Sequence, residues 1–430
     1  MNQRLETHMN QNVFRFSGGE FAELIIERAE GAYVYGADRR PVLDFTSGQM
    51  SSILGHSHPE IVATIREAAA QLDHVHSSFL STPVLALTEA LNGLLPPSLC
   101  KVLPLSTGGE SNEAALRMAK MATGGFEIVA FDRSWHGVTG GAGASTFNGA
   151  RQGYGPTLSG AMALPTPDAY RSPFARDGRY DWQAELDFGF EMLDRQSVGR
   201  YAAVIAEPVL SSAGIIELPH GYLGALKRKC EERGMLLILD EAQTGLGRTG
   251  DMFAFEHEGV VPDILNLSKT LGAGLPLSAT ITSPEIEATC HERGYIFYTT
   301  HAADPLPAAV GAKVIEIIVR DALAARAREL GTYMKGLLLD LQQRHEVIGD
   351  VRGRGLLLGV ELVTDRHSKN PARELGLAVS RRCLELGASL NISRRSVANI
   401  FRIAPPLTVK REQIDTAIEI LDTALGEHRS

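Results

Sequence analysis

The sequence predicts an α/β protein with a mainly parallel sheet and a smaller α+β domain towards the C-terminal end. Short apolar runs alternate with helical patterns through the middle of the chain, which is typical of βαβ units. Several of these runs end in a polar residue, as strands do where they reach the ligand-binding edge of an open sheet. From about residue 316 the pattern changes to long helices and two further strand-like runs, "VRGRGLLLGVELV" and "IFRIAPPLTV".

We expect three parts: an N-terminal segment over 1–60, a large domain over 61–315 and a small C-terminal domain over 316–430. The segment "AYVYGADRRPVLDFTSG" predicts a hairpin near the start. The strand candidates of the large domain are "KVLPLS", "EIVAF", "AAVIAEPVL", "MLLILDE" and "ILNLSK". Between the first two lies a helix, "SNEAALRMAKMA", whose apolar residues recur at helical spacing. That apolar face consists of Ala115, Met118, Ala119 and Ala122.

The bulk composition is that of an ordinary globular protein: 430 residues, 44% hydrophobic and 22% charged. A net charge of -9 argues against a nucleic-acid or anionic-membrane partner, because no positive field would attract phosphates. The four cysteines are far apart and form no CxxC pair, so we expect reduced thiols in a cytoplasmic protein. The polar N-terminus predicts no signal peptide, and no run of about 18 apolar residues predicts a membrane span.

Two charged residues follow apolar runs and carry the first chemical prediction. Asp240 ends "LLILD", and Lys269 follows "ILNLS". Each alone has an ordinary explanation, an ion-paired acid or a lysine that reaches solvent. If Asp240, Lys269 and Glu207 meet at one edge of the sheet, they form a site that is suitable for pyridoxal 5'-phosphate (PLP). The amine forms an imine with the aldehyde, and the carboxylate keeps a proton on the pyridine nitrogen.

Two further motifs fit the same cofactor. "STGGESNEAA" joins small residues to a helix N-terminus, whose free amide groups bind phosphate, although many turns look alike. "SWHG" places the rings of Trp135 and His136 after a predicted strand. One ring could stack on the pyridine, and the alternative is an aromatic residue packed at a strand end.

Together these motifs resemble the class III aminotransferases, a family of PLP enzymes of fold type I. Within that family the resemblance is closest to the 2,2-dialkylglycine decarboxylases, and it extends from about Phe14 to the last helix. The shared pieces include "ILDEAQTGLGRTG", "LSKTLGAGLPL", "AEPVLSSAG" and "FRIAPPL". The pieces that fit the decarboxylases in particular are "LDFTSGQMSSILGHSHPEI", "LDHVHSS", "YTTHAADPLPAAVG" and "VRGRGLLLGVE".

The resemblance implies a role for each matching residue. Lys269 would bind PLP covalently and carry the proton, Asp240 would pair with the pyridine nitrogen, and Gln243 would bond the ring hydroxyl. A homodimer with shared sites is implied because one phosphate contact would come from the neighbouring subunit, and the pairing of dimers into tetramers stays open. The implied cofactor residues are Thr107, Gly108, Gly109, His136, Glu207, Asp240, Gln243, Lys269 and the neighbour's Thr300. The implied catalytic and substrate residues are Lys269, Trp135, Gln49, Ser212 and Arg402.

Gln49 and Arg402 are the residues that would decide the reaction. The bond that breaks must stand perpendicular to the pyridine plane, and a dialkylglycine has no Cα–H to place there. A neutral amide at Gln49 can hold the carboxylate in that position and loses little when its charge departs. Arg402 can bind a substrate carboxylate with two parallel hydrogen bonds. Without the resemblance, Gln49 would be interpreted as a polar residue in a turn, and Arg402 as an arginine in a surface ion pair.

The resemblance also implies an alkali cation, potassium or sodium, near the active site. Oxygen ligands suit such an ion. The implied ligands are Val75, Ser77, Thr300, Ala302 and Asp304.

The sequence departs from the decarboxylase pattern in three places. Val138 stands where a methionine is expected, and Gly109 replaces an alanine in the phosphate loop. Arg394 and Arg395 lie in "NISRRSVANIF", where the decarboxylases have a more neutral stretch. These arginines either favour an anionic substrate or belong to a solvated loop.

We therefore expect an enzyme that decarboxylates 2-aminoisobutyrate or isovaline and passes the amino group to pyruvate, giving L-alanine. Two rivals stay open: an ordinary class III ω-aminotransferase, and a PLP-dependent racemase or carbon–carbon bond-forming enzyme. A purely binding role is the remaining alternative, and the presence of both Lys269 and Asp240 argues against it.

Overall fold

The computed structural model describes residues 11–14, 16, 21, 22, 24–148, 151, 153, 155–176, 178–392 and 398–428. The predicted loop with Arg394 and Arg395 lies outside these residues.

A seven-stranded sheet forms the centre of the molecule, in the order β4-β14-β13-β12-β9-β5-β6. Every strand but β14 runs in the same direction, because β14 is antiparallel to both of its neighbours. The predicted α/β fold with a mainly parallel sheet is therefore confirmed. The strands are β4 (Lys101–Leu105), β5 (Glu127–Phe131), β6 (Ala161–Leu164), β9 (Tyr201–Ala206), β12 (Leu236–Asp240), β13 (Ile264–Leu267) and β14 (Ser278–Thr282).

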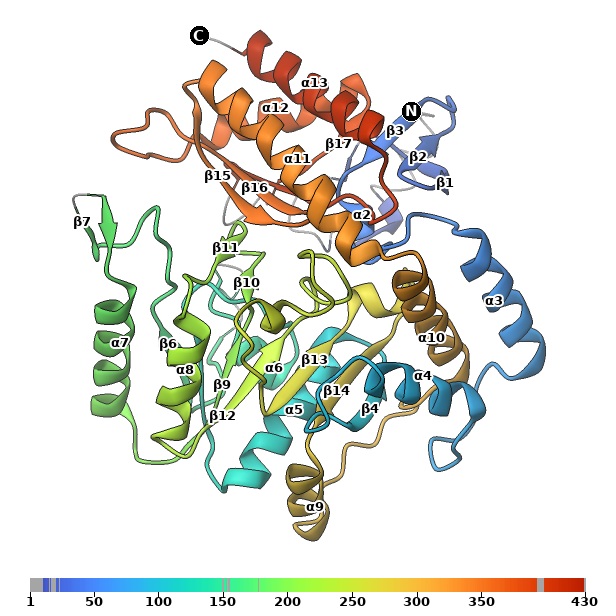
Figure 1. Cartoon of the computed structure of the whole chain (residues 1–430), viewed down its shortest axis with the longest axis vertical. Helices are drawn as coiled ribbons and strands as arrows, with labels where there is room; N and C mark the ends of the chain where they lie inside the picture. Colours follow the sequence, from blue (N-terminus) through green and yellow to red (C-terminus); the bar gives the residue numbers. More distant parts are fainter. Residues whose placement is uncertain are drawn as a thin grey trace.

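Helices cover both faces of this sheet, because successive side chains of a strand point to opposite faces. In β12, Ile238 packs in one apolar cluster with Ala115 and Ala119 of α5 (Gly108–Thr123). Leu237 packs in the other, larger cluster with residues of α8 (Tyr222–Glu231). In Figure 1 these layers fill the lower half of the molecule.

The remaining elements around the large sheet are short strands and flanking helices. α10 packs against α3 and α4, and α9 packs against α5. Their bounds are α3 (Pro59–Gln71), α4 (Thr82–Asn92), α6 (Gly140–Ala144), β7 (Ala175–Arg176), β8 (Arg179–Tyr180), α7 (Trp182–Gln196), β10 (Val209–Leu210), β11 (Ile216–Glu217), η2 (Ala254–His257), η3 (Lys269–Gly272), α9 (Pro284–Glu292) and α10 (Pro305–Arg320).

The C-terminal third forms an antiparallel sheet in the order β15-β16-β19-β18, with helices packed against it in the upper half of Figure 1. Its strands are β15 (Ile348–Arg354), β16 (Leu357–Leu362), β18 (Asn391–Ile392) and β19 (Ile400–Ile403). Its helices are α11 (Leu323–Arg344), α12 (Arg373–Leu386) and α13 (Arg411–Glu427). The domain boundaries stay predictions, and α10 runs across the one between residues 315 and 316.

The N-terminal strands pair with the C-terminal part of the chain. β1 (Ile26–Glu30), β2 (Tyr33–Gly36) and β3 (Pro41–Asp44) form a sheet with β17 (Ala388–Ser389). Just beyond β3, the backbone N–H of Ala404 donates to the carbonyl of Phe45 at 2.8 Å. This contact joins the segment that leads to Gln49 with the segment that follows Arg402.

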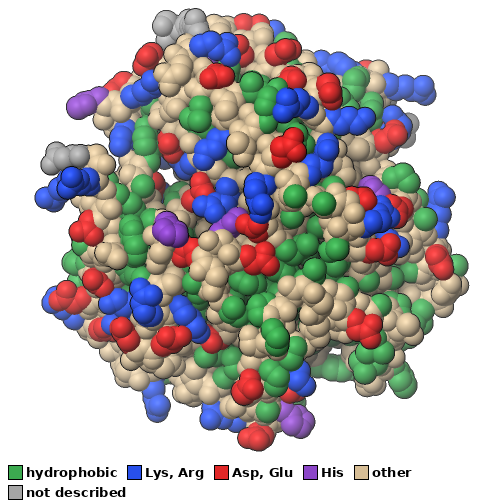
Figure 2. Space-filling view, in the orientation of Figure 1, with side chains coloured by type: hydrophobic (Ala, Val, Ile, Leu, Met, Phe, Trp, Pro, Cys, Tyr) green, Lys and Arg blue, Asp and Glu red, His purple; other side chains and the backbone are tan. Residues whose placement is uncertain are grey.

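Acidic and basic side chains are interspersed over the face of the molecule shown in Figure 2. None of the described helices combines the length and the apolar character that crossing a membrane requires.

Candidate active site

A cavity of about 350 Å³ opens at the carboxyl edge of the large sheet, between β12, β13 and the start of α5. Parallel strands bring their final residues to one edge, so residues from distant motifs meet here. Nine sequence-predicted residues line it: Thr107, Gly108, Gly109, Trp135, His136, Glu207, Asp240, Gln243 and Lys269.

Asp240 is a buried carboxylate with three hydrogen-bond partners. Its Oδ2 accepts from Asn112 Nδ2 at 2.8 Å and lies 2.9 Å from His136 Nδ1. Its Oδ1 accepts from the backbone N–H of Ala242 at 3.1 Å. Burial alone would raise the pKa of Asp240, but His136, Lys269 and Asn112 stabilise the charged form and lower the pKa overall. Asp240 is therefore ionised at neutral pH and can hold a cationic N–H.

Asn112 is a site residue that the sequence analysis missed. Besides Asp240, its amide donates to the carbonyl of His136 at 2.6 Å, and its Oδ1 accepts from Asn266 at 2.7 Å. It sits in the first turns of α5, inside the motif "STGGESNEAA". A polar residue on the buried face of that predicted helix was the available signal.

His136 and Glu207 are both buried next to Asp240. His136 Nε2 has no hydrogen-bond partner within the part of the chain that the structure describes. Glu207 Oε1 accepts from the backbone N–H of Trp135 at 3.0 Å. Burial raises the pKa of Glu207 to about 7, assisted by Asp240 and opposed by His136 and Lys269. This carboxyl group can change its charge near neutral pH.

Lys269 follows β13 in a left-handed backbone conformation, with φ of 31°. Its carbonyl accepts from Ser51 Oγ at 3.0 Å. Burial lowers the pKa of the Lys269 amine, and the charge of Arg402 acts in the same direction. Asp240 and Glu207 oppose this effect. A lowered pKa leaves more of the amine neutral, which is the form that attacks an aldehyde.

The start of α5 provides an anion site beside Lys269. Thr107 is the N-cap, and its hydroxyl accepts from the Glu110 N–H. A Cβ on Gly108 would lie 2.7 Å from Ser268 Oγ, so any larger residue there would have to displace that hydroxyl. Ser268 Oγ is itself buried without a partner among the described residues. A helix N-terminus with unused donors and no side chain in the way fits a phosphate group.

Gln49 and Arg402 lie outside the residues that line this cavity. Gln49 belongs to α2 (Ser47–Met50), a single left-handed turn in which every residue has positive φ. The turn is tied to the Lys269 loop by the Ser51 hydroxyl. The side chain of Gln49 is exposed.

Arg402 lies on β19 opposite Gly359 of β16, and its Nε is buried without a partner among the described residues. Burial lowers its pKa, and the charge of Glu207 partly offsets this. Ser212 is half-buried just after β10 and also lies outside the cavity lining.

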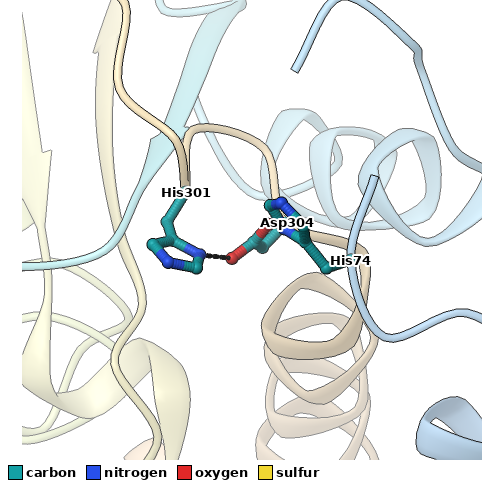
Figure 3. A group of neighbouring side chains, drawn as sticks. All are labelled: His74, His301 and Asp304. Atoms are coloured by element: carbon teal, nitrogen blue, oxygen red, sulfur yellow. Dashed lines mark hydrogen bonds and ion pairs between the residues drawn. The ribbon is translucent and has the colours of Figure 1, made fainter. Parts of the chain in front are cut away.

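The predicted cation ligands come from two segments that meet at Asp304 (Figure 3). Asp304 Oδ1 lies 2.5 Å from His74 Nδ1, and Oδ2 lies 2.6 Å from His301 Nδ1. Val75 and Ser77 follow His74, while Thr300 and Ala302 flank His301. The sequence analysis missed both histidines, whose imidazole rings contact the two oxygens of the Asp304 carboxylate in this structure.

The comparisons with known proteins agree with this geometry. The family profile described as aminotransferase class-III matches residues 17–425. The chain is 56% identical to an uncharacterized aminotransferase of Schizosaccharomyces pombe, over 97% of this chain and 93% of the relative. This chain belongs to the class III aminotransferases.

Two other members show the range of this family. A leucine/methionine racemase of Thermococcus litoralis is 34% identical, over 95% of this chain and 91% of the racemase. The structure of a PLP-bound amine transaminase from an uncultivated Pseudomonas species superposes with a TM-score of 0.90. Its identity is 28%, and the match covers 97% of this chain and 99% of the transaminase.

The class III aminotransferase described here is a PLP-dependent enzyme, and its site fits that cofactor. Asp240 is an ionised acceptor for a pyridinium N–H, and the α5 N-terminus has room and donors for a phosphate. Lys269 lines the same cavity as these two groups.

Proposed function

We propose that this aminotransferase decarboxylates 2,2-dialkylglycines and passes their amino group to a 2-oxo acid. With 2-aminoisobutyrate and pyruvate, the products are acetone, carbon dioxide and L-alanine, which balance the atoms of the substrates. The observation that supports this most is the left-handed turn that presents Gln49 next to the Lys269 loop. An ordinary residue pays about 1–2 kcal/mol to adopt that conformation, and such strain concentrates at functional sites.

PLP, when bound, supplies an aldehyde for the amino group and a protonated ring that accepts an electron pair. Asp240 would keep the ring nitrogen protonated, with Asn112 and His136 orienting its carboxylate, and Gln243 would bond the ring hydroxyl. Thr107, Gly108 and Gly109 would hold the phosphate, together with Thr300 of a second subunit.

The chain's own residues then select which substrate bond breaks. Arg402, whose Nε is buried without a partner among the described residues, would anchor the substrate carboxylate. Gln49 would add a neutral hydrogen bond that orients this same carboxylate for departure. Ser212 and Trp135 complete the pocket around the substrate.

Lys269 moves the proton in both halves of the reaction. Its lowered pKa leaves more of the released amine in the neutral form, which can accept a proton. In the first half it would supply the proton that replaces the departed carbon dioxide. In the second half it would deliver a proton to the Cα that comes from the 2-oxo acid, which gives the amino acid product.

The decisive experiment is product analysis with 2-aminoisobutyrate, pyruvate and PLP, following carbon dioxide, acetone and L-alanine. Equal amounts of all three support the proposal. Amino transfer from L-alanine without carbon dioxide from 2-aminoisobutyrate would overturn it and leave an ordinary aminotransferase.

The second candidate function is amino-acid racemization, because a racemase is among the similar proteins. In that case Lys269 would exchange the Cα proton of a single amino acid. Incubating L-alanine, L-leucine or L-methionine with the enzyme in deuterium oxide tests it. Accumulation of the D-amino acid, with no 2-oxo acid required, would support racemization over decarboxylation.

We also propose an alkali cation, potassium or sodium, bound by Val75, Ser77, Thr300, Ala302 and Asp304. The convergence of both segments on Asp304 supports a site there. The ion would displace the two imidazoles from the carboxylate. Because imidazole nitrogens also bind divalent transition metals, activity is to be compared in potassium, sodium and zinc after dialysis against a chelator. Activation by zinc alone would contradict the alkali ion.

The active form is proposed to be a homodimer. The exposed side chains of Phe79, Leu80, Ile296 and Tyr298, with His76, form what we call the ring patch. The hydroxyl of Tyr298 lies 2.8 Å from His76 Nε2, and the ring centroid of His76 is 6.3 Å from that of Phe79. Exposed apolar side chains gathered beside the Thr300 segment suit a second copy of this chain.

A further inference from the structure

Arg248 is a charged residue buried without an acidic partner among the residues that the structure describes. It is fully buried in the loop after β12. Burial lowers its pKa to about 9, with no acidic group offsetting the effect. Its Nε has no hydrogen-bond partner among the described residues. Because a buried unpaired charge is costly, its presence calls for an explanation in the fold or in the function.

The guanidinium group joins three separate segments. Its Nη1 donates to the carbonyl of Leu356 at 3.2 Å and to the carbonyl of Pro405. Its Nη2 donates to Ser47 Oγ at 3.4 Å. The Ser47 hydroxyl in turn donates to the carbonyl of Ala404 at 2.8 Å. The network thus runs from the loop after Asp240 through the Ser47 turn to the end of β19.

Both substrate-binding side chains sit next to this network. Gln49 is two residues after Ser47, and Arg402 is two residues before Ala404. The turn of Gln49 is left-handed throughout, and such a conformation persists only where the surroundings hold it. The bonds of Ser47 and Arg248 are contacts that hold it.

We propose that Arg248 is a positioning residue that sets the distance between Gln49 and Arg402, so that both reach one substrate's carboxylate. This inference rests on the proposed function of those two side chains. The same buried positive charge also favours anionic substrates in the neighbouring cavity.

The geometry requires arginine in particular. Its planar fork directs separate N–H groups to Ser47 Oγ, Leu356 and Pro405 at once, which a single ammonium group on a flexible stem cannot do. An Arg248→Lys variant therefore keeps the charge and loses the alignment.

The test compares 2-aminoisobutyrate with isopropylamine, which differ only by the carboxylate. Each is mixed with the PLP-loaded enzyme in a stopped-flow instrument, and the dissociation constant is taken from how the initial absorbance change, before any carbon dioxide is released, depends on ligand concentration. In the wild type, 2-aminoisobutyrate should bind more tightly. In Arg248→Lys, its affinity should fall at least about tenfold, or about 1.4 kcal/mol. Isopropylamine should change less than about twofold.

Arg326→Lys is the matched control, since Arg326 Nη2 also donates to a backbone carbonyl, that of Val409 at 2.8 Å. It should leave the ratio of the two affinities unchanged. Ser47→Ala removes the bridging hydroxyl and, like Arg248→Lys, should lower the affinity for 2-aminoisobutyrate relative to that for isopropylamine. This variant provides the test if Arg248→Lys does not fold.

An unchanged ratio in Arg248→Lys and Ser47→Ala, equal losses for both ligands, or equal binding of both ligands by the wild type would overturn the inference. A failure of the proposed function can be distinguished from a failure of this inference. A wild type that prefers the carboxylate ligand but releases no carbon dioxide refutes decarboxylation and leaves the role of Arg248 in place.

Discussion

Single polar residues determine the chemistry of this site because they are buried where water cannot screen them. Asp240 stays ionised through His136 and Asn112, while Glu207 is pushed towards neutrality by burial. Two carboxylates close to one amine therefore carry different charges at the same pH. The environment of each residue, and not its type, assigns its role.

Replacing Gln49 tests whether this residue selects the substrate bond that breaks. In Gln49→Ala, we expect decarboxylation of 2-aminoisobutyrate to slow about 10- to 100-fold, as the loss of one hydrogen bond to a charged group implies. The half-reaction with L-alanine should change much less, because Cα–H cleavage does not need Gln49 to hold the departing group. Single-turnover absorbance measurements follow both reactions.

Gln49→Gly is the control for the backbone, since glycine adopts the left-handed conformation freely. The same selective loss in both variants assigns the effect to the amide. An equal loss of both half-reactions would make Gln49 a purely structural residue.

Replacing Glu207 tests the charge balance around Lys269. The Glu207 carboxylate raises the pKa of the Lys269 amine, against the larger lowering effect of burial. In Glu207→Gln the pKa of Lys269 should fall further, so the neutral amine forms at lower pH. The pH profile for PLP association with the apoenzyme, measured by stopped-flow absorbance, should shift to lower pH.

The two profiles should differ only above about pH 7, because below it the wild-type Glu207 already holds its proton. Superimposable profiles across the whole range would show that Glu207 does not influence Lys269.

Among the structural elements, α5 contributes most to the site. Its N-terminus lies at the sheet edge because β4 ends there, and its buried face carries Asn112 towards Asp240. The backbone fits closely at Gly108 and loosely at Gly109, where a Cβ would meet Thr139 Oγ1 at 3.6 Å. One helix start thus supplies both the phosphate donors and an orienting amide.

Gly108→Ala should weaken PLP binding to the apoenzyme by more than about tenfold, or about 1.4 kcal/mol. The added methyl would lie 2.7 Å from Ser268 Oγ and displace it or the loop. Gly109→Ala, the matched variant one residue on, should bind PLP with nearly unchanged affinity. Fluorescence titration with PLP measures both, and equal effects would contradict a phosphate site at this helix start.

At the scale of the whole molecule, the segment with Thr300 reaches the site, because the carbonyl of His301 accepts from Ser106 Oγ at 3.5 Å and Ser106 lines the cavity. His74 and His301 add further exposed polar groups around Asp304 in the same region. A second copy packed there would bury the apolar side chains and bring its own Thr300 to the phosphate. We therefore expect assembly and cofactor retention to be linked.

Ile296→Lys should shift the protein towards monomer and weaken PLP retention, because a charge would have to be buried in the interface. Sedimentation velocity and PLP content after gel filtration measure the two effects. Val198→Lys, at a similarly exposed aliphatic residue outside the ring patch, is the control. A dimeric Ile296→Lys variant with normal PLP content would contradict the shared site.

The sequence by itself determined the α/β class, the strand that ends at Asp240, the strand just before Lys269 and the helix of the "STGGESNEAA" motif, which begins at Gly108 rather than at the predicted Ser111. These features are indicated by the local periodicity of apolar residues and by the polar residue that ends each apolar run. Only the tertiary structure decided which distant groups meet. Asn112 and Asp240 are 128 positions apart, His74 and Asp304 are 230 apart, and Arg248 and Ser47 are 201 apart. Contacts between such distant residues depend on strand order and domain packing, which no local pattern records.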